Sequence, residues 1–360
     1  MVEDTAISPD LGTIYYTANA GSTPGDNDRR HIFSVNAAGG RPSQVTRGED
    51  SQWWPQGVQG GIVYVNAGSR EPFTIAFNGR KLNSDQTPAD FPAASMVVPK
   101  LVSFKSADGM TIQGTLFVPT GYSGKRPAVI FVHGGPPRQM MTTWHYFDYY
   151  SYGYGSNQYL ANHGVVVLSV NYRLGIGYGH DFQNPVKAGP QGASEYNDVL
   201  AAGKYLQHLS NVDPKRIGIY GGSYGGYLTA MALAKNSDIF KVGVDQHGVH
   251  DWTDFPEWFG TPAEHRYQQP NTKAFLKTAW LSSPDAYIST WRSPVLLIHG
   301  DDDRNVHFHQ TVDLAERLRL AHVQYDELVI PNEIHGFLRW QGWFDADTAA
   351  DAFLMSHLKP

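Results

Sequence analysis

The chain of 360 residues contains no cysteine, no block of basic residues and no long apolar run. Without cysteine, disulfides, thiol nucleophiles and zinc sites built on thiolates are excluded, while the redox state of the compartment stays undecided. No stretch approaches the roughly 18 consecutive apolar residues of a membrane-spanning helix, so we expect no membrane contact. The formal net charge is −6 and basic residues are not clustered, so nucleic acid is not an expected partner.

The beginning of the chain resembles the interior of a repeat more than a leader segment. Residues 1–12 (MVEDTAISPDLG) lack the basic start and the apolar segment of a secretory signal. We therefore expect the chain to be the C-terminal portion of a longer protein. Its location is left open, because a soluble protein of the cytoplasm and one of the periplasm both fit.

Residues 1–95 predict a β-rich part that ends in a connector. Short apolar or alternating segments stand between turn clusters; they are Thr13–Thr17, His31–Val35, Gly61–Val65 and Pro72–Phe77. The first pair of segments is echoed by the second pair with a period in the forties, which is typical of β-propeller blades. We expect about two blades, with a small β-sandwich as the alternative. Two blades do not close a ring, so a second chain or a homo-oligomer could cover their open faces.

Residues 96–360 predict a different architecture, in which apolar strands alternate with helices. The expected strands are Leu101–Phe104, Ile112–Val118, Val129–His133, Val165–Val170, Ile217–Tyr220, Val242–Asp245, Val295–Ile298 and Gln324–Val329. The expected helices are Ala193–Leu209, Ser223–Asn236, His309–Ala321 and Asp347–Leu358. The later strands are apolar throughout, as in a parallel sheet that helices cover on both faces. This alternation predicts a doubly wound, mostly parallel α/β sheet.

One serine stands among glycines between a predicted strand and a predicted helix, in the stretch IYGGSYGGY (residues 219–227). It matches G-x-S-x-G, the nucleophile elbow of α/β-hydrolases, with Ser223 as the nucleophile. The turn is so tight that Gly221 and Gly225 must lack side chains, and the serine takes a strained backbone conformation. The alternative is a glycine-rich turn in which the serine only caps the helix. A phosphate-binding loop is excluded because no G-x-x-x-x-G-K-[ST] is present.

A serine nucleophile needs a base and a carboxylate that orients the base. In α/β-hydrolases the chain order is serine, acid, histidine, and two later strand ends carry suitable residues. We assign His335 as the general base and Asp303 as its partner. From the residues alone, Asp301 and Asp302 remain rivals for the acid, and Glu333 lies close to the histidine in sequence.

Two other histidine positions have less specific interpretations. His299 ends a strand and is expected to pack beneath the site. His307 and His309 could chelate a metal, but no third ligand is evident. We therefore predict neither a metal nor a cofactor.

The oxyanion of an acyl-transfer reaction needs two N–H donors. One is the N–H of Tyr224, which follows the nucleophile. The other is expected in the loop after an earlier apolar strand, where the chain reads VIFVHGGPP (residues 129–137). Gly135 is our choice and Gly134 its rival, since a glycine lets the main chain approach a carbonyl closely. An ordinary Gly-Pro turn is the alternative.

Several motifs together resemble the prolyl oligopeptidase family of serine peptidases. They are FVHGGP (residues 131–136), NYRLGIGYGHDF (171–182), DPKRIGIYGGSYGGY (213–227), SPVLLIHGDDDRNVHF (293–308) and IHGF (334–337). They occur in the family's order over most of residues 101–360. The resemblance implies a C-terminal α/β-hydrolase domain joined to an N-terminal β-propeller. It places Ser223, Asp303 and His335 on the catalytic triad, and Gly135 and Tyr224 on the oxyanion donors.

Two branches of the family are similar to different parts of the sequence. His133 in HGGP resembles acylaminoacyl peptidases, since dipeptidyl peptidase IV has a tyrosine there. Asn305 and the residues up to Phe308 resemble dipeptidyl peptidases. His133 and Asn305 are therefore candidate substrate contacts.

The resemblance also implies an apolar, aromatic pocket beside the elbow. Tyr224 and Val306 match this pocket residue by residue. Trp252 and Trp258 follow the next strand and are further candidates, with a core or lid role as the alternative; Phe255 and Phe259 lie between and beside them.

The sequence thus favours a serine peptidase that hydrolyses short peptides through an acyl-enzyme on Ser223. Two alternatives stay open: a carboxylesterase with the same triad, and a non-catalytic scaffold that kept the fold.

Overall fold

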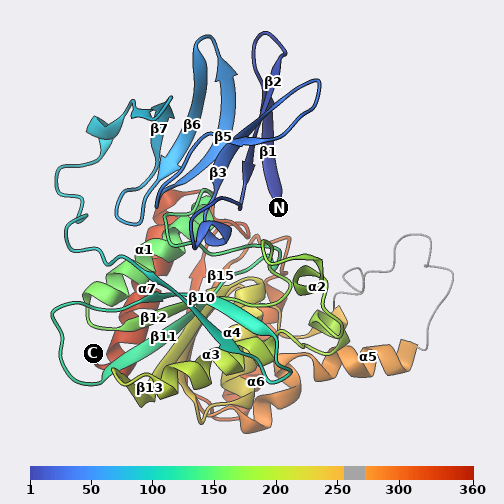
Figure 1. Cartoon of the computed structure of the whole chain (residues 1–360). Helices are drawn as coiled ribbons and strands as arrows, with labels where there is room; N and C mark the ends of the chain where they lie inside the picture. Colours follow the sequence, from blue (N-terminus) through green and yellow to red (C-terminus); the bar gives the residue numbers. More distant parts are fainter. Residues whose placement is uncertain (255–271) are drawn as a thin grey trace.

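The structure is a computed structural model that describes residues 1–254 and 272–360. Two small sheets lie at one end of a larger sheet that is flanked by helices (Figure 1). The first small sheet consists of β1 (Val2–Ile7), β2 (Thr13–Ala18), β3 (His31–Asn36) and β4 (Ser43–Gln44). The second consists of β5 (Ser51–Val58), β6 (Gly61–Ala67), β7 (Thr74–Phe77) and β8 (Arg80–Lys81).

Each small sheet is an antiparallel meander in chain order, as in a propeller blade. Ile32 of the first sheet packs with Ile62, Tyr64 and Ala76 of the second in one apolar cluster. The four predicted strands correspond to β2, β3, β6 and β7. Strands β1, β4, β5 and β8 were not predicted. β4 and β8 have two residues each, β5 contains a proline and a register shift, and β1 (VEDTAI) has two consecutive acidic residues near its start.

The large sheet has the order β16-β15-β14-β13-β11-β12-β10-β9. Its strands are β9 (Lys100–Lys105), β10 (Thr111–Phe117), β11 (Arg126–Val132), β12 (Val166–Asn171), β13 (Val212–Gly222), β14 (Phe240–Gln246), β15 (Val295–Gly300) and β16 (Tyr325–Ile330). Strand β10 pairs antiparallel with both β9 and β12. All other neighbours in the sheet, from β12 through β11 to β16, pair parallel. The mostly parallel sheet and all eight predicted strands are confirmed, with ends that differ by a few residues.

Helices cover both faces of this sheet (Figure 1). They are α1 (Asp148–Asn162), α2 (His180–Gln183), α3 (Tyr196–His208), α4 (Tyr224–Lys235), α5 (Thr272–Leu281), α6 (His309–Leu320) and α7 (Trp340–Leu358). Short 3-10 helices are η1 (Asp26–Asp28), η2 (Ser84–Gln86), η3 (Gly189–Gln191), η4 (Trp252–Asp254) and η7 (Pro284–Thr290). Among the described helices, none is long and apolar enough to cross a bilayer.

Strand β11 shows how the two faces are filled. Ala128, Ile130 and Val132 join the apolar cluster with α3, α4 and α6. Val129 and Phe131 point to the other face and join the cluster with α1 and α7. Since side chains alternate along a strand, a continuous apolar run supplies both cores.

One helix prediction needs correction, and three helices (α1, α2 and α5) were not predicted. Helix α7 begins at Trp340, seven residues before the predicted start at Asp347. Helix α1 was not predicted, because its residues (DYYSYGYGSNQYLAN) include two glycines and many residues of modest helix propensity. Its stability comes from packing, since Tyr150, Tyr154 and Leu160 are buried against the sheet.

The small sheets lie over the carboxyl edge of the large sheet and are fastened to it by hydrogen bonds. Asn19 donates to the carbonyl of Gly177 at 2.9 Å, and Tyr154 donates to that of Ser69 at 2.7 Å. Between the small sheets and β9, the main chain of Val97 exchanges two hydrogen bonds with the side-chain amide of Gln158 in α1, both at 2.9 Å. The N-terminal sheets therefore face the loops in which the catalytic residues are predicted.

A buried acid between α1 and α7 gives a stability prediction. Burial, with the neighbouring charge of Asp347, raises the pKa of Asp351 well above its ordinary 3.8. One of its oxygens, Oδ1, has no hydrogen-bond partner among the described residues. The folded state holds this proton more tightly than the unfolded state, so the free energy of unfolding falls as the pH rises above about 4.

We therefore expect Asp351→Asn to raise the free energy of unfolding at pH 8 by about 1 kcal/mol. The gain should largely vanish near pH 3, where Asp351 of the native sequence is protonated in both the folded and the unfolded chain. Urea unfolding at the two pH values measures this, and Asp345→Asn on the exposed face of α7 is the control. An equal effect of Asp351→Asn at both pH values would show that the acid is not desolvated.

Candidate active site

Ser223 lies in the sharp turn between β13 and α4, with φ 59° and ψ −121°. A Cβ added at Gly221 or Gly225 would overlap the carbonyl oxygen of Val132 in the neighbouring strand. The backbone of the turn therefore crosses β11 at a distance that only glycine allows. The Ser223 N–H donates to Gln246 of β14 at 2.9 Å, which holds the strained residue in place. The geometry is that of a nucleophile elbow.

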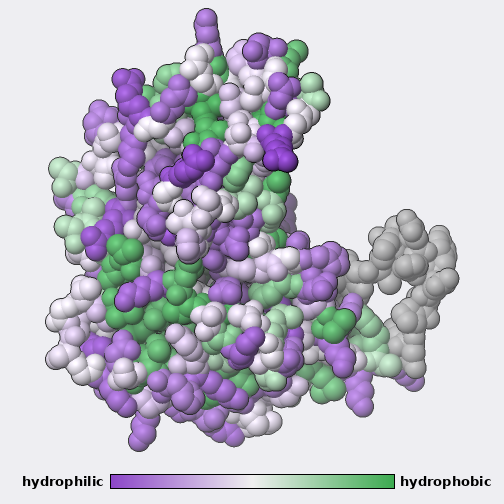
Figure 2. All heavy atoms as spheres, viewed as in Figure 1, coloured by the Kyte–Doolittle hydropathy of each residue, from purple (hydrophilic) through white to green (hydrophobic). Residues whose placement is uncertain are grey.

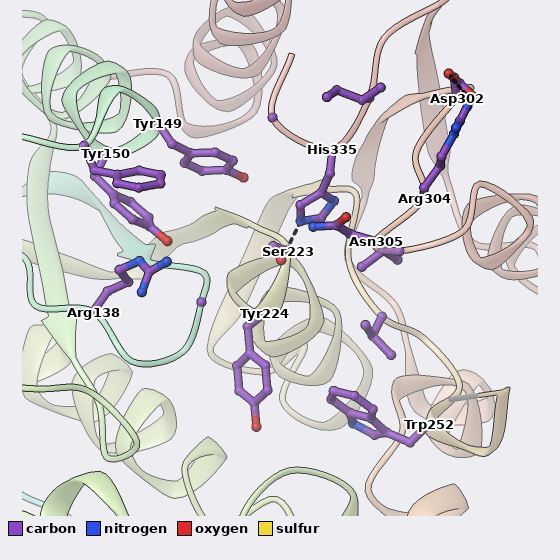
Figure 3. Close-up of a pocket in the computed structure, with 16 residues that line it drawn as sticks. Arg138, Tyr149, Tyr150, Ser223, Tyr224, Trp252, Asp302, Arg304, Asn305 and His335 are labelled. Atoms are coloured by element: carbon purple, nitrogen blue, oxygen red, sulfur yellow. Dashed lines mark hydrogen bonds and ion pairs between the residues drawn. The ribbon is translucent and has the colours of Figure 1, made fainter. Parts of the chain in front are cut away.

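The serine, a histidine and an aspartate form one hydrogen-bonded chain. His335 Nε2 lies 2.8 Å from Ser223 Oγ (Figure 3), and His335 Nδ1 lies 2.6 Å from Asp303 Oδ2. The three residues come from the ends of β13, β15 and β16, which meet at the carboxyl edge of the sheet. The structure thus brings the three residues predicted for the triad together.

Asp303 is a buried carboxylate with several donors. Its Oδ1 accepts the N–H groups of Asn305 at 2.8 Å and Val306 at 3.0 Å. Its Oδ2 accepts hydrogen bonds from His335 and from His299, which lies 3.0 Å away. Burial alone would raise the pKa of Asp303, but the hydrogen bonds from the two histidines lower it well below its ordinary value. The carboxylate is therefore ionised and can orient the imidazole.

The other candidates for the triad carboxylate bind groups other than His335. Asp301 is exposed and accepts the N–H of Asn332 at 2.6 Å. Asp302 is exposed and forms an ion pair with Arg304 at 3.1 Å. The remaining rival, Glu333, is buried and accepts from the N–H of Leu338 and from Arg339 Nε.

The HGG loop lies directly against the elbow. A Cβ on Gly134 would be 2.7 Å from the carbonyl oxygen of Gly222 and 3.1 Å from Ser223 Cβ. Gly135 lines the cavity beside the serine. As the first residue of α4, Tyr224 has an N–H without an intrahelical acceptor. Both predicted donors therefore border the serine.

A cavity of about 720 Å³ opens in front of Ser223 (Figure 3). Its lining consists of Gly135, Arg138, Phe147, Tyr149, Tyr150, Ser223, Tyr224, Val249, Trp252, Asp302, Arg304, Asn305, Val306, Ile334, His335 and Gly336. Of the predicted substrate contacts, Trp252, Asn305 and Val306 line the cavity. His133 does not, since it is completely buried and its ring stacks on Tyr172 at 4.3 Å. The predicted Trp258, like Phe255 and Phe259, falls outside the described residues.

The buried acid Glu195 holds Tyr224 in place through the tyrosine hydroxyl. The Tyr224 hydroxyl donates to Glu195 Oε1 at 2.8 Å, and Glu195 is fully buried. Burial raises the pKa of Glu195. The hydrogen bond to Glu195 fixes the ring of Tyr224, whose centre lies 5.9 Å from that of Trp252, a second aromatic residue of the cavity wall.

Two residues beside the triad were not found by sequence reasoning. The His247 ring lies 4.3 Å from that of His335, and its Nε2 is hydrogen-bonded to the Tyr149 hydroxyl at 2.7 Å. Burial and the neighbouring His335 lower the pKa of His247 well below 6.5, so this ring is neutral. No local motif marks either residue, because the contact joins the unpredicted helix α1 to the end of β14.

Within the described residues, one group places three metal-ligand atoms within 4.8 Å of one another: His247, Asp303 and His335. Two of these already belong to the hydrogen-bonded chain with Ser223. The arrangement is better explained by proton transfer than by metal binding. His307 and His309 are exposed, and His309 pairs with Asp254 at 3.0 Å.

The strand order of the large sheet, with this elbow on its fifth strand, is that of an α/β-hydrolase. Within that class, the model of the prolyl oligopeptidase family matches residues 151–360. This is more than half of the sequence, and the chain belongs to that family.

Curated relatives support the assignment. The chain is 29% identical over 252 residues to the uncharacterized peptidase YuxL of Bacillus subtilis, covering 67% of this chain and 36% of the relative. It is 31% identical over 253 residues to dipeptidyl aminopeptidase BIII of Pseudoxanthomonas mexicana, covering 66% and 35%. The chain thus spans about a third of the length of these relatives.

Solved structures with little sequence identity share the fold. An acylaminoacyl peptidase in complex with Z-Gly-Gly-Phe-chloromethyl ketone matches 100% of this chain and 55% of its own, with a TM-score of 0.77 and 21% identity. A puromycin-hydrolyzing peptidase of Mycobacterium tuberculosis matches 98% and 54%, with a TM-score of 0.79 and 22% identity. Because the matches include both N-terminal sheets, they confirm the partial propeller and not the β-sandwich alternative.

Proposed function

We propose that this chain carries the catalytic part of a serine peptidase that cleaves short peptides through an acyl-enzyme on Ser223. The observation that carries the proposal is the chain of hydrogen bonds from Ser223 through His335 to an ionised Asp303, at 2.8 and 2.6 Å. Membership of a peptidase family supports peptides as the substrate class. As part of this proposal, residues 1–95 form the partial propeller with its connector and residues 96–360 form the catalytic part. The hydrogen bonds between the main chain of Val97 and Gln158 of α1 support a boundary near this position.

In the proposed reaction, Ser223 Oγ attacks the carbonyl carbon of the cleaved bond while His335 Nε2 accepts its proton. Asp303 holds the imidazole with its other nitrogen protonated and stabilises the imidazolium that forms. The N–H groups of Gly135 and Tyr224 bind the oxyanion of the tetrahedral intermediate. His335 then donates the proton to the leaving amine, and water releases the acyl group by the same steps in reverse order.

The acyl side of the substrate has an apolar wall to pack against. Tyr224, Val249, Trp252 and Val306 all line the cavity and are buried. A side chain of small or medium size next to the cleaved bond would lose its contact with water there. The partial propeller above the carboxyl edge gives only part of a cover, so a second chain or a homo-oligomer remains part of the proposal.

Turnover of two substrate types tests this function. We expect an aminoacyl or dipeptidyl amide with alanine or proline next to the cleaved bond to be hydrolysed, with release of the amine measured by absorbance. A short acyl ester of the same acyl group is the comparison. Hydrolysis of the ester alone would favour a carboxylesterase, and turnover of neither, with no labelling by a fluorophosphonate, would favour a non-catalytic scaffold.

A further inference from the structure

Among the described residues, two arginines line the cavity, and they differ in their partners. Arg304 is exposed and its guanidinium binds Asp302, so the two charges cancel. Arg138 has no carboxylate within ion-pair distance among the described residues; Nη1 donates to the carbonyl of Pro137 at 2.9 Å, and Nε is buried without a partner there. Within the part of the chain that the structure describes, the cavity therefore holds one positive charge that no carboxylate neutralises.

The position of Arg138 is fixed by its neighbours. Its side chain runs over Gly135, since a Cβ added there would lie 2.9 Å from Arg138 Cγ. The guanidinium lies 5.3 Å from the centre of the Phe147 ring, a cation–π contact. The main chain of Arg138 accepts the N–H of Ile176 at 3.1 Å and thus joins the loop after β12. A cation held this way needs little rearrangement to bind a ligand.

The surroundings of this charge favour an anionic ligand. Tyr150 and Phe147 stand beside it, and Figure 3 shows the guanidinium directed toward the Tyr150 hydroxyl, on the side of Ser223 away from Arg304. Burial raises the pKa of Tyr150 to about 12 although Arg138 opposes the shift, so the phenol stays protonated. A protonated hydroxyl and a guanidinium together form a donor pair for a carboxylate.

We propose that Arg138 is a specificity-determining residue that binds a carboxylate of the peptide substrate. This inference rests on the proposed peptidase function and deepens it by naming the substrate class. The carboxylate has two possible sources with the same chemistry: the free C-terminus of the leaving fragment, or an acidic side chain near the cleaved bond. A charge-assisted hydrogen bond of this kind changes affinity by about 10- to 100-fold.

The test compares substrates that differ only in one charge. The first pair of peptides has the same sequence and ends in a free carboxylate or in a carboxamide. The second pair is amidated and carries glutamate or glutamine beside the cleaved bond. We expect kcat/KM of the native chain to favour the acid by about tenfold or more in one of the two pairs. That pair identifies the source of the carboxylate.

Variants separate recognition from folding. Arg138→Gln should reduce the preference to less than threefold, and Arg138→Lys should retain part of it because the charge remains. Arg304→Gln, the matched comparison, should leave the preference as it is, since Arg304 is paired with Asp302. A merely structural Arg138 would lower the turnover of acid and neutral peptides alike and leave their ratio unchanged.

Binding to the Ser223→Ala variant distinguishes failure of this inference from failure of the peptidase proposal. Calorimetry with the acid and neutral peptides measures recognition without cleavage. Tighter binding of the acid, lost on adding Arg138→Gln, supports the inference even when the native chain cleaves no peptide. Equal kcat/KM and equal affinity for both members of both pairs in the native background, or a preference that persists in Arg138→Gln, overturns it.

Discussion

Replacing Ser223 with alanine should lower kcat for an amide substrate by about 10⁵- to 10⁶-fold. The hydroxyl is the atom that the proposed mechanism makes covalent, and no neighbouring group can replace it at the elbow. A small residual activity should remain, because the oxyanion donors and the cavity still bind the substrate and stabilise the oxyanion that forms when water attacks directly. Steady-state release of the amine, followed over hours at high enzyme concentration, measures the loss.

Loss of activity must be separated from loss of fold in this variant. The Ser223 side chain does not cap α4, and its strained φ is no worse for alanine than for serine. We therefore expect the urea unfolding curve of Ser223→Ala to lie close to that of the native chain. Residual activity within tenfold of native, in a folded variant, would contradict the assignment of the nucleophile.

Asp303→Asn should reduce kcat by about 10⁴-fold, the size of effect found when the triad acid of other serine hydrolases is made neutral. The present carboxylate accepts hydrogen bonds from both His335 Nδ1 and His299 Nε2. An asparagine would present an N–H group to one of these nitrogens and favour the wrong tautomer of the base. Initial rates at saturating substrate measure the effect.

Asp301→Asn is the matched control, since Asp301 belongs to the same DDD run and does not line the cavity. Within the described residues, its side chain accepts one hydrogen bond, from the main-chain N–H of Asn332, and an amide oxygen can accept the same bond. We expect less than a threefold change in kcat for this variant. Similar losses in Asp301→Asn and Asp303→Asn would mean that the loop, and not the carboxylate on His335, is responsible.

The sequence predicted the structure best where the residue pattern depends on the local backbone geometry or on a strand that is buried on both faces. The apolar run of β11 predicts a strand with two buried faces, and both apolar clusters take residues from it. The elbow could be predicted because tight backbone approach requires glycine, and Gly221 and Gly225 are the positions that face Val132. The end positions of β15 and β16 then limited the acid and the base to a few residues, among which the family resemblance selected Asp303.

The parts that were not predicted depend on contacts between distant segments. Helix α1 has little helix propensity of its own, so its existence and the position of Tyr149 follow from packing. The pairing of His247 with His335 joins two strand ends without any shared motif. No sequence motif singled out Arg138, because its significance lies in a charge that no described carboxylate balances.

The short strands of the N-terminal sheets illustrate a second limit. β4 and β8 contain two residues each, too few for any periodicity to be visible. Strand β5 alternates poorly because its register shifts between Trp53 and Gln56. Figure 2 shows apolar groups on the surface of these sheets as well as on the larger domain, so hydropathy alone would not separate the two parts.

The central claim, that Ser223 is an activated nucleophile, is tested most directly by mapping the adduct of a fluorophosphonate. The native chain should gain a single adduct, and peptide mass spectrometry should place it on Ser223 in IYGGSYGGY. An adduct on a different residue, or an undiminished adduct on the Ser223→Ala variant, would contradict the account.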